Sequence, residues 1–74
     1  MRKTYHVEAQ WDPEAKVWVS HSDVPGLVIE TATLGEFEAL MRALVPELIE
    51  DHGGADGAVS VEWSSSGAFE LAAA

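Results

Sequence analysis

The chain has 74 residues, the length of one small domain, and a chain this short can bury only a modest part of its surface on folding. It has no cysteine, which excludes a disulfide framework and a thiolate metal site, and its apolar runs fall short of the roughly 20 residues that a membrane span needs. The absence of such a run predicts a soluble protein, and the absence of cysteine fits the reducing cytoplasm. Thirteen acidic residues against four scattered basic ones give a net charge of −9, so direct nucleic-acid binding is not expected.

Two strands joined by a tight turn are predicted near the start of the chain. Residues 5–11 alternate between apolar and polar types, which is the period of a half-buried strand. The letters "DPEA" that follow suit a type I turn, and residues 16–21 then form a second strand. In this second strand we expect Val17 and Val19 on the inner face and Trp18 on the outer face.

A third strand and one helix are predicted next. The turn "DVPG" leads into residues 27–31, which read as a short strand. Thr33 and Glu36 have the spacing of a capping box at a helix start. Apolar residues then recur at helical spacing as far as Ile49, and Pro46 is expected to kink the helix or to restart it after Val45.

After a glycine-rich loop, residues 58–63 alternate again, and a short last strand carrying Phe69 and Leu71 is expected. The whole chain, residues 1–74, is therefore predicted to be a single α+β domain. It has two layers: an antiparallel sheet, made of a three-stranded meander and one or two strands after the helix, with one helix on one face.

The sheet face that the helix leaves open is the candidate functional surface. The strand alternation assigns the following side chains to it: His6, Glu8, Lys16, Trp18, Glu30, Glu62 and Glu70. Four of them are carboxylates on different strands, so the face can serve as a negatively charged docking surface for a basic protein, with Trp18 as an aromatic anchor. It can equally be a solvated surface without a role.

Two other functions stay open. Clustered carboxylates can hold magnesium in a nuclease, and Glu30 would be a ligand there, but side chains on separate strands rarely converge as a metal requires. Alternatively, the open face or a free strand edge pairs two copies into a homo-oligomer.

No catalytic or cofactor-binding motif is found in the sequence. The letters "HSD" at residues 21–23 contain the residue types of a nucleophilic triad, but neighbours in a strand point to alternate sides. The three histidines lack metal-ligand spacing, and "GGADG" lacks the lysine and the following helix of a phosphate-binding loop. We therefore expect a protein that is not an enzyme and that has no cofactor and no metal.

The order of these motifs resembles the HicB-like antitoxin domain, in which a strand is followed by a "D-[LV]-P-G" turn, a short strand and a "T-x-x-E" helix start. The turn residues here are Asp23, Val24, Pro25 and Gly26, and the helix start is Thr33 to Glu36. The likeness is closest to a short branch known only as a domain of unknown function. Its further motifs "WD", "VW" and "PEL" are matched by Trp11, Asp12, Val17, Trp18, Pro46, Glu47 and Leu48.

This resemblance implies a truncated ribonuclease-H-like fold without catalysis. It also implies an antitoxin-like function, in which the domain binds and blocks a small basic RNA-cleaving toxin. Full antitoxins of this kind usually add a DNA-binding segment, and no separate DNA-binding domain is expected after Leu71.

Overall fold

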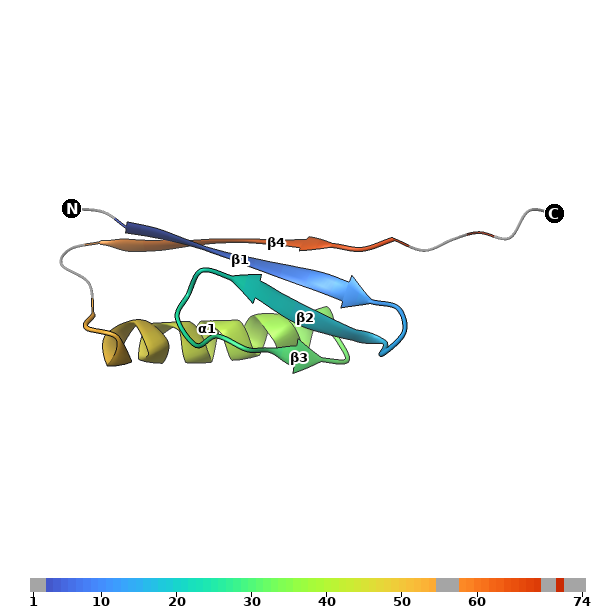
Figure 1. The fold of residues 1–74 in the computed structure, drawn as a ribbon, viewed down its shortest axis with the longest axis horizontal. Coiled ribbons are helices and arrows are strands. Elements are labelled where there is room, and N and C mark those ends of the chain that lie inside the picture. The colour runs from blue at the N-terminus through green and yellow to red at the C-terminus, as the bar shows by residue number, and fades with distance from the viewer. Residues whose placement is uncertain (1–2, 55–57, 69–70, 72–74) are drawn as a thin grey trace.

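The computed structural model describes residues 3–54, 58–68 and 71. These residues form one helix and four strands, which follow one another in the order β1 (Lys3–Asp12), β2 (Val17–Ser22), β3 (Glu30–Thr31), α1 (Leu34–Asp51) and β4 (Val59–Ser66) (Figure 1). The predicted two-layer α+β class, with one helix on one face of a sheet, is confirmed. Phe69 and Glu70 lie outside the described residues, and Leu71 belongs to no strand.

The sheet has the strand order β3-β2-β1-β4. β1 pairs antiparallel with β2, and β2 pairs antiparallel with β3, which is the predicted meander. β4 pairs parallel with β1, so the sheet is mixed and the expectation of an antiparallel sheet throughout is wrong. The reason is the route of α1, which carries the chain back to the end of the sheet where β1 begins, so that β4 enters from the same end as β1 (Figure 1).

The turn between β1 and β2 sets which residues of β2 face the helix. It has four residues, and its last one, Lys16, adopts a positive φ of 58° and donates its backbone N–H to the Asp12 carbonyl at 2.7 Å. The Asp12 carboxylate also accepts the backbone N–H groups of the two residues after the proline, at 3.0 and 3.2 Å. This loop places Trp18 directly opposite Trp11.

The register reverses the prediction for β2. Trp18 shares the helix side of the sheet with Trp11 and packs against the core, whereas Val17 and Val19 lie on the open side. The assignment of Trp18 to the open face is therefore wrong, and so is the placement of the two valines. Adding or removing one loop residue moves every side chain of the next strand to the opposite face of the sheet. This loop also holds a non-glycine residue, Lys16, in the left-handed region.

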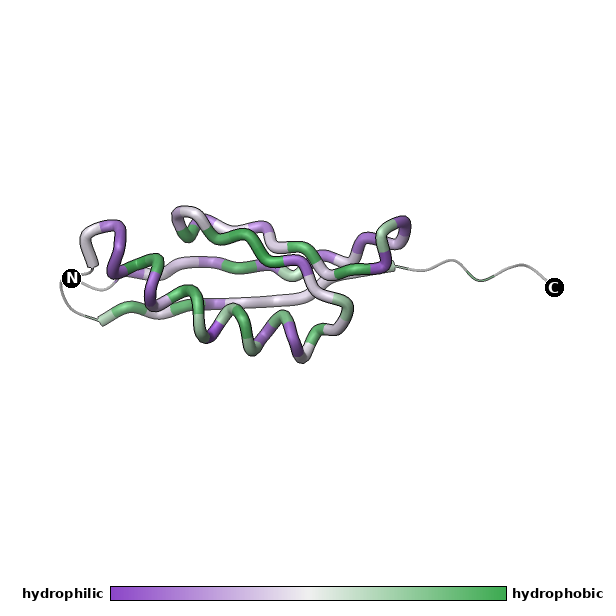
Figure 2. The backbone as a smooth tube through the Cα atoms, turned by 90° about the horizontal axis from the view of Figure 1, so that it is seen from below, coloured by the Kyte–Doolittle hydropathy of each residue, from purple (hydrophilic) through white to green (hydrophobic). Residues whose placement is uncertain are grey.

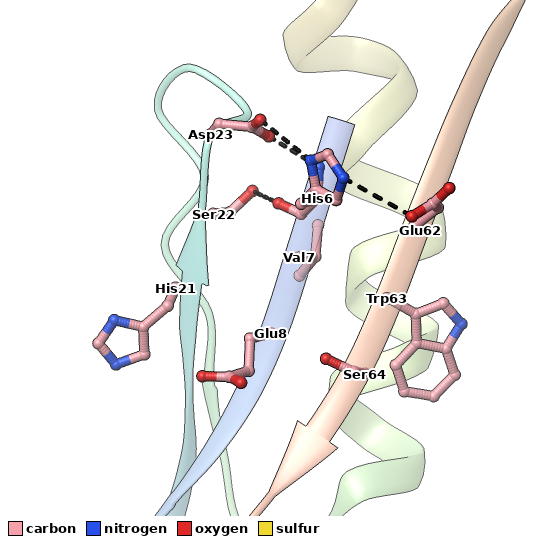
Figure 3. A pocket seen from close by; sticks show the side chains of 9 residues that line it. All are labelled: His6, Val7, Glu8, His21, Ser22, Asp23, Glu62, Trp63 and Ser64. Atoms are coloured by element: carbon pink, nitrogen blue, oxygen red, sulfur yellow. Dashed lines mark hydrogen bonds and ion pairs between the residues drawn. The ribbon is translucent and has the colours of Figure 1, made fainter. Parts of the chain in front are cut away.

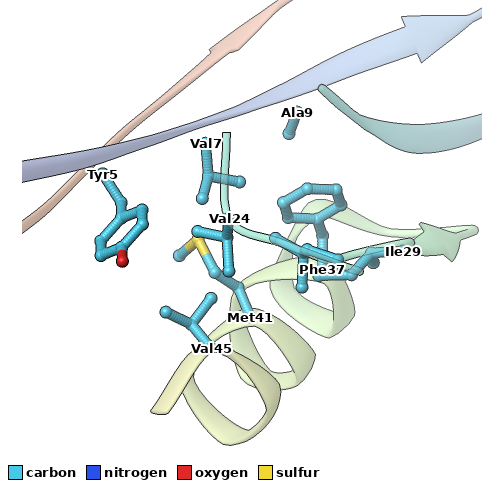
Figure 4. Packing of buried hydrophobic residues seen from close by; sticks show 9 residues of the cluster. Tyr5, Val7, Ala9, Val24, Ile29, Phe37, Met41 and Val45 are labelled. Carbon is cyan, nitrogen blue, oxygen red and sulfur yellow. The ribbon is translucent and has the colours of Figure 1, made fainter. Parts of the chain in front are cut away.

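The core lies between β1 and α1 and is closed by the segment that leads into β3 (Figure 4). The three buried residues of α1 recur every fourth position, which is the helical repeat. Hydrophobic and hydrophilic residues alternate along α1 accordingly (Figure 2). The buried hydrophobic residues are Tyr5, Val7, Ala9, Val24, Leu27, Ile29, Phe37, Met41 and Val45.

The start of α1 has a local explanation. The Thr33 hydroxyl accepts the Glu36 backbone N–H at 3.2 Å and donates to the Glu36 carboxylate at 2.9 Å, so the predicted cap is present. α1 continues through Pro46 as one element, so the predicted restart after Val45 does not occur. Among the described residues, no helix combines the length and the apolar composition that a bilayer span requires.

Gly26, in the turn before β3, has a φ of +76°, in the left-handed region that a side chain disfavours. We expect Gly26→Ala to lower the free energy of unfolding by about 1–2 kcal/mol, because alanine is strained there. Gly35→Ala is the matched control: a Cβ there meets nothing within 4 Å, and the change is expected to raise stability by up to about 1 kcal/mol. Urea denaturation measures both, and equal effects of the two variants would contradict this account.

Candidate functional site

The open face is the side of the sheet opposite α1. Strand pairing places His6 beside Glu62 and Glu8 opposite His21, and all four side chains lie on this face. Glu30 reaches the same face from β3, where it pairs with Val19. Three of the four predicted carboxylates, Glu8, Glu30 and Glu62, thus share one surface, while the fourth, Glu70, lies outside the described residues.

A cluster of three exposed side chains, His6, Asp23 and Glu62, occupies one end of the open face (Figure 3). We call it the His6 cluster. The imidazole Nδ1 lies 3.4 Å from an Asp23 carboxylate oxygen, and Nε2 lies 3.6 Å from a Glu62 carboxylate oxygen. The backbone N–H of His6 also donates to the other Asp23 oxygen at 2.8 Å. One imidazole is therefore bracketed by two carboxylates from different elements.

Asp23 is not among the residues that the strand alternation predicts for this surface. The alternation of β2 extends from His21 to Asp23, but the predicted parity, with Val17 and Val19 on the inner face, would place Asp23 on the inner face as well. In the structure β2 is inverted, and Asp23 bonds to β1 through its own backbone: its N–H donates to the His6 carbonyl at 3.3 Å.

The hydrogen bond from the His6 backbone N–H lowers the pKa of the Asp23 carboxyl below its ordinary value of 3.8. A lowered folded-state pKa gives stability that is present above the unfolded-state pKa and lost as pH falls through the folded-state pKa. We therefore expect Asp23→Asn, whose amide oxygen can still accept this bond, to lose less stability than the wild type when pH falls from 6 to below about 3. Thermal denaturation across this range measures the difference, and parallel curves for the two proteins would contradict it.

The side chains of the "HSD" residues make contacts other than those of a catalytic relay. The Ser22 hydroxyl donates to the His6 backbone carbonyl at 2.8 Å and accepts the Val24 backbone N–H at 2.9 Å. The His21 ring projects away from Ser22 (Figure 3). Within residues 3–54, 58–68 and 71, no group of three or more histidine and carboxylate side chains is arranged to hold a metal ion.

Among the described residues, no lysine or arginine forms an ion pair with a carboxylate of the open face. Lys3 lies over the Tyr5 ring, 4.9 Å from its centre, on the helix side of β1. Arg42 donates to Glu38 at 2.8 Å, one turn away on α1. The open face thus presents an excess of negative charge to any partner.

The family model described as a domain of unknown function, DUF1902, matches residues 4–68. A similar solved structure is a hypothetical protein, TTHA1013, from the extremely thermophilic bacterium Thermus thermophilus. It is 46% identical, the match covers 93% of this chain and 97% of that chain, and the TM-score is 0.71. The comparison with curated proteins finds no match. The DUF1902 match confirms the predicted resemblance to a domain of unknown function. It is compatible with a HicB-like branch.

Proposed function

This chain belongs to the DUF1902 family of domains of unknown function, and we propose that it is a non-catalytic protein-interaction module whose open face binds a basic protein. The observation that carries the proposal is the gathering of Glu8, Glu30, Glu62 and Asp23 on one sheet face that α1 does not cover. Opposite fields speed the encounter of two proteins and disfavour wrong partners. A face of this kind is suited to a partner rich in lysine and arginine.

The partner we propose is a small basic RNA-cleaving toxin in the cytoplasm, which this domain blocks as an antitoxin does. Support comes from the resemblance to HicB-like antitoxin domains, whose turn motif is present here as Asp23–Gly26. The fold gives that motif a role in the surface, because Asp23 joins the His6 cluster. The carboxylates are exposed and stand on separate elements, which suits charge recognition better than proton transfer.

The test begins with a search for a small basic protein encoded beside the gene of this chain, which is then co-expressed and purified with it. Titration calorimetry is then performed with the wild type and with the triple variant Glu8→Gln, Glu30→Gln, Glu62→Gln. We expect the triple variant to bind at least tenfold more weakly, and wild-type binding to weaken as salt is raised. The RNA-cleaving activity of the partner should be suppressed by the wild type and much less by the variant.

A matched control removes the same charge elsewhere: Glu14→Gln, Glu47→Gln, Glu50→Gln, all exposed and away from the open face. It is expected to bind nearly as tightly as the wild type. If the control loses as much affinity as the triple variant, net charge and not the open face determines binding. Absence of any basic partner beside the gene would count against the antitoxin role.

A further inference from the structure

β4 is an edge strand with one free side. Its eight residues pair with β1 along their full length, and no other strand of the described chain pairs with it. The Lys3 backbone N–H donates to the Ala58 carbonyl, which fixes the pairing pattern: even-numbered residues of β4 turn their backbone groups to β1. The N–H and C=O groups of the odd-numbered residues Val59, Val61, Trp63 and Ser65 therefore point outward. We call this row the β4 edge.

The β4 edge lacks the usual protections against pairing with another chain. Edge strands are commonly protected from such pairing by a lysine, a proline, a bulge or a short length. β4 has the sequence VSVEWSSS, with no lysine and no proline, and its register to β1 runs unbroken from Val59 to Ser66. Its backbone groups are therefore open to pairing with a further strand, and Glu62 is the only charged residue of β4.

On the helix side of the sheet, β4 is less buried than β1. On β1, Tyr5 and Val7 are 8% and 1% exposed, whereas their register partners on β4, Val61 and Trp63, are each 37% exposed. These two side chains form one wall of a groove, and the other wall is the α1 surface made by Met41, Arg42, Val45 and Pro46. An apolar strip thus runs directly alongside the β4 edge.

We propose that the β4 edge pairs with the β4 edge of a second copy of this chain, which forms a symmetric dimer through a continuous eight-stranded sheet. The charge distribution favours a second copy. Two chains of net charge −9 repel each other over most of their surface, but the β4 strand carries a single charge, Glu62, whose side chain points to the open face. The β4 edge and its groove are therefore a surface where like-charged copies can meet.

The register of the dimer follows from symmetry and charge. Two strands related by a two-fold axis run antiparallel, and both copies then carry their helices on the same side of the joined sheet. Centring the axis on Glu62 would set two carboxylates directly opposite, which is destabilising. Centring it on Trp63 sets Glu62 against Ser64 of the second copy, brings the two indoles together, and pairs Ser60 with Ser66. The outward backbone groups of Val61, Trp63 and Ser65 then all find partners.

The first test is sedimentation velocity over a range of concentrations. The wild type is expected to sediment with twice the 8.0 kDa mass of one chain at high concentration. Ser65→Pro removes an outward N–H without removing a bond to β1, so this variant should keep its circular dichroism and associate at least tenfold more weakly. Ser65→Thr is the control and should dimerise like the wild type.

Trp63→Lys is a second variant, which disrupts the dimer by charge and not by loss of a backbone N–H. It should also be monomeric, because two lysines would meet at the axis. A wild type that is monomeric throughout, or variants that dimerise as well as the wild type, would overturn the proposal. Loss of dimerisation leaves the open face intact, so binding of a basic partner reports separately on the proposed function.

The second test reads the register. The chain has no cysteine, so Ser60→Cys with Ser66→Cys introduces the only thiols. In the proposed register these residues form a non-hydrogen-bonded pair across the two copies, with a Cα separation of about 4.5 Å that a disulfide can bridge. Mild oxidation should yield a covalent dimer from the double variant and little from either single variant. Absence of the cross-link in a protein that sediments as a dimer would refute this register.

Discussion

Replacing Phe37 with alanine is expected to remove a large share of the stability of the domain. Phe37 is 0% exposed and sits between α1 and β1, where its ring points toward Ala9 (Figure 4). A buried Phe→Ala change costs about 3–5 kcal/mol, from lost burial and from the cavity left behind. A chain of 74 residues has about 4–11 kcal/mol of total stability, so the variant is expected to lose at least about a quarter of it and, at the lower end of that range, all of it.

Two variants of the same helix give this experiment its controls. Phe37→Leu keeps part of the volume and should lose clearly less stability than Phe37→Ala. Leu40→Ala removes a large apolar side chain that is 42% exposed, and it should cost less than about 1 kcal/mol. Circular dichroism during urea denaturation measures all three. A similar loss for Leu40→Ala and Phe37→Ala would contradict the placement of the core.

The helix could be predicted from the sequence because its signals are local. The Thr33 cap and the apolar repeat are each contained within a few residues, and the structure places the cap and the buried residues Phe37, Met41 and Val45 where the repeat puts them. The effect of Pro46 was less predictable. Proline removes one helical bond, but whether the helix stops there depends on its packing against the sheet, which the local sequence does not encode.

The face of β2 could not be predicted, because it depends on the geometry of one loop. A positive φ at Lys16 is uncommon for a residue with a side chain, and it fixes a four-residue loop that sets Trp18 opposite Trp11. The direction of β4 was missed for a different reason. Parallel pairing with β1 joins residues more than 50 positions apart, and alternation within β4 reads the same in either direction.

The candidate site was largely predicted despite the error in β2, because its glutamates come from other strands. Glu8, Glu30 and Glu62 lie on β1, β3 and β4, where the alternation was read correctly. The error exchanged the aromatic anchor, Trp18, for Val17 and Val19 on the open face, and the structure adds Asp23 in the His6 cluster. The open face thus keeps its predicted glutamates, gains one carboxylate and also carries two valines.

Trp18→Ala is the second substitution with a large expected effect, and the corrected register determines what it changes. The Trp18 ring lies 5.3 Å from the Trp11 ring at an interplanar angle of 55°, and it packs against the core from the helix side. Because the side chain is half-buried, its loss is expected to cost about 2 kcal/mol of stability, less than a fully buried tryptophan would. Binding of a basic partner to the open face should stay within about twofold of the wild type, since such a change is worth under about 0.5 kcal/mol.

This outcome separates the two possible placements of Trp18. An interface anchor would lose at least tenfold in affinity on truncation while stability changed little. Trp18→Phe serves as the control, because it keeps an aromatic ring beside Trp11 and should recover more than half of the lost stability. Thermal denaturation and partner titration on the same protein samples measure both properties. If Trp18→Ala lost affinity but kept its stability, Trp18 would have to lie on the open face, and the pairing register of β2 with β1 would be wrong.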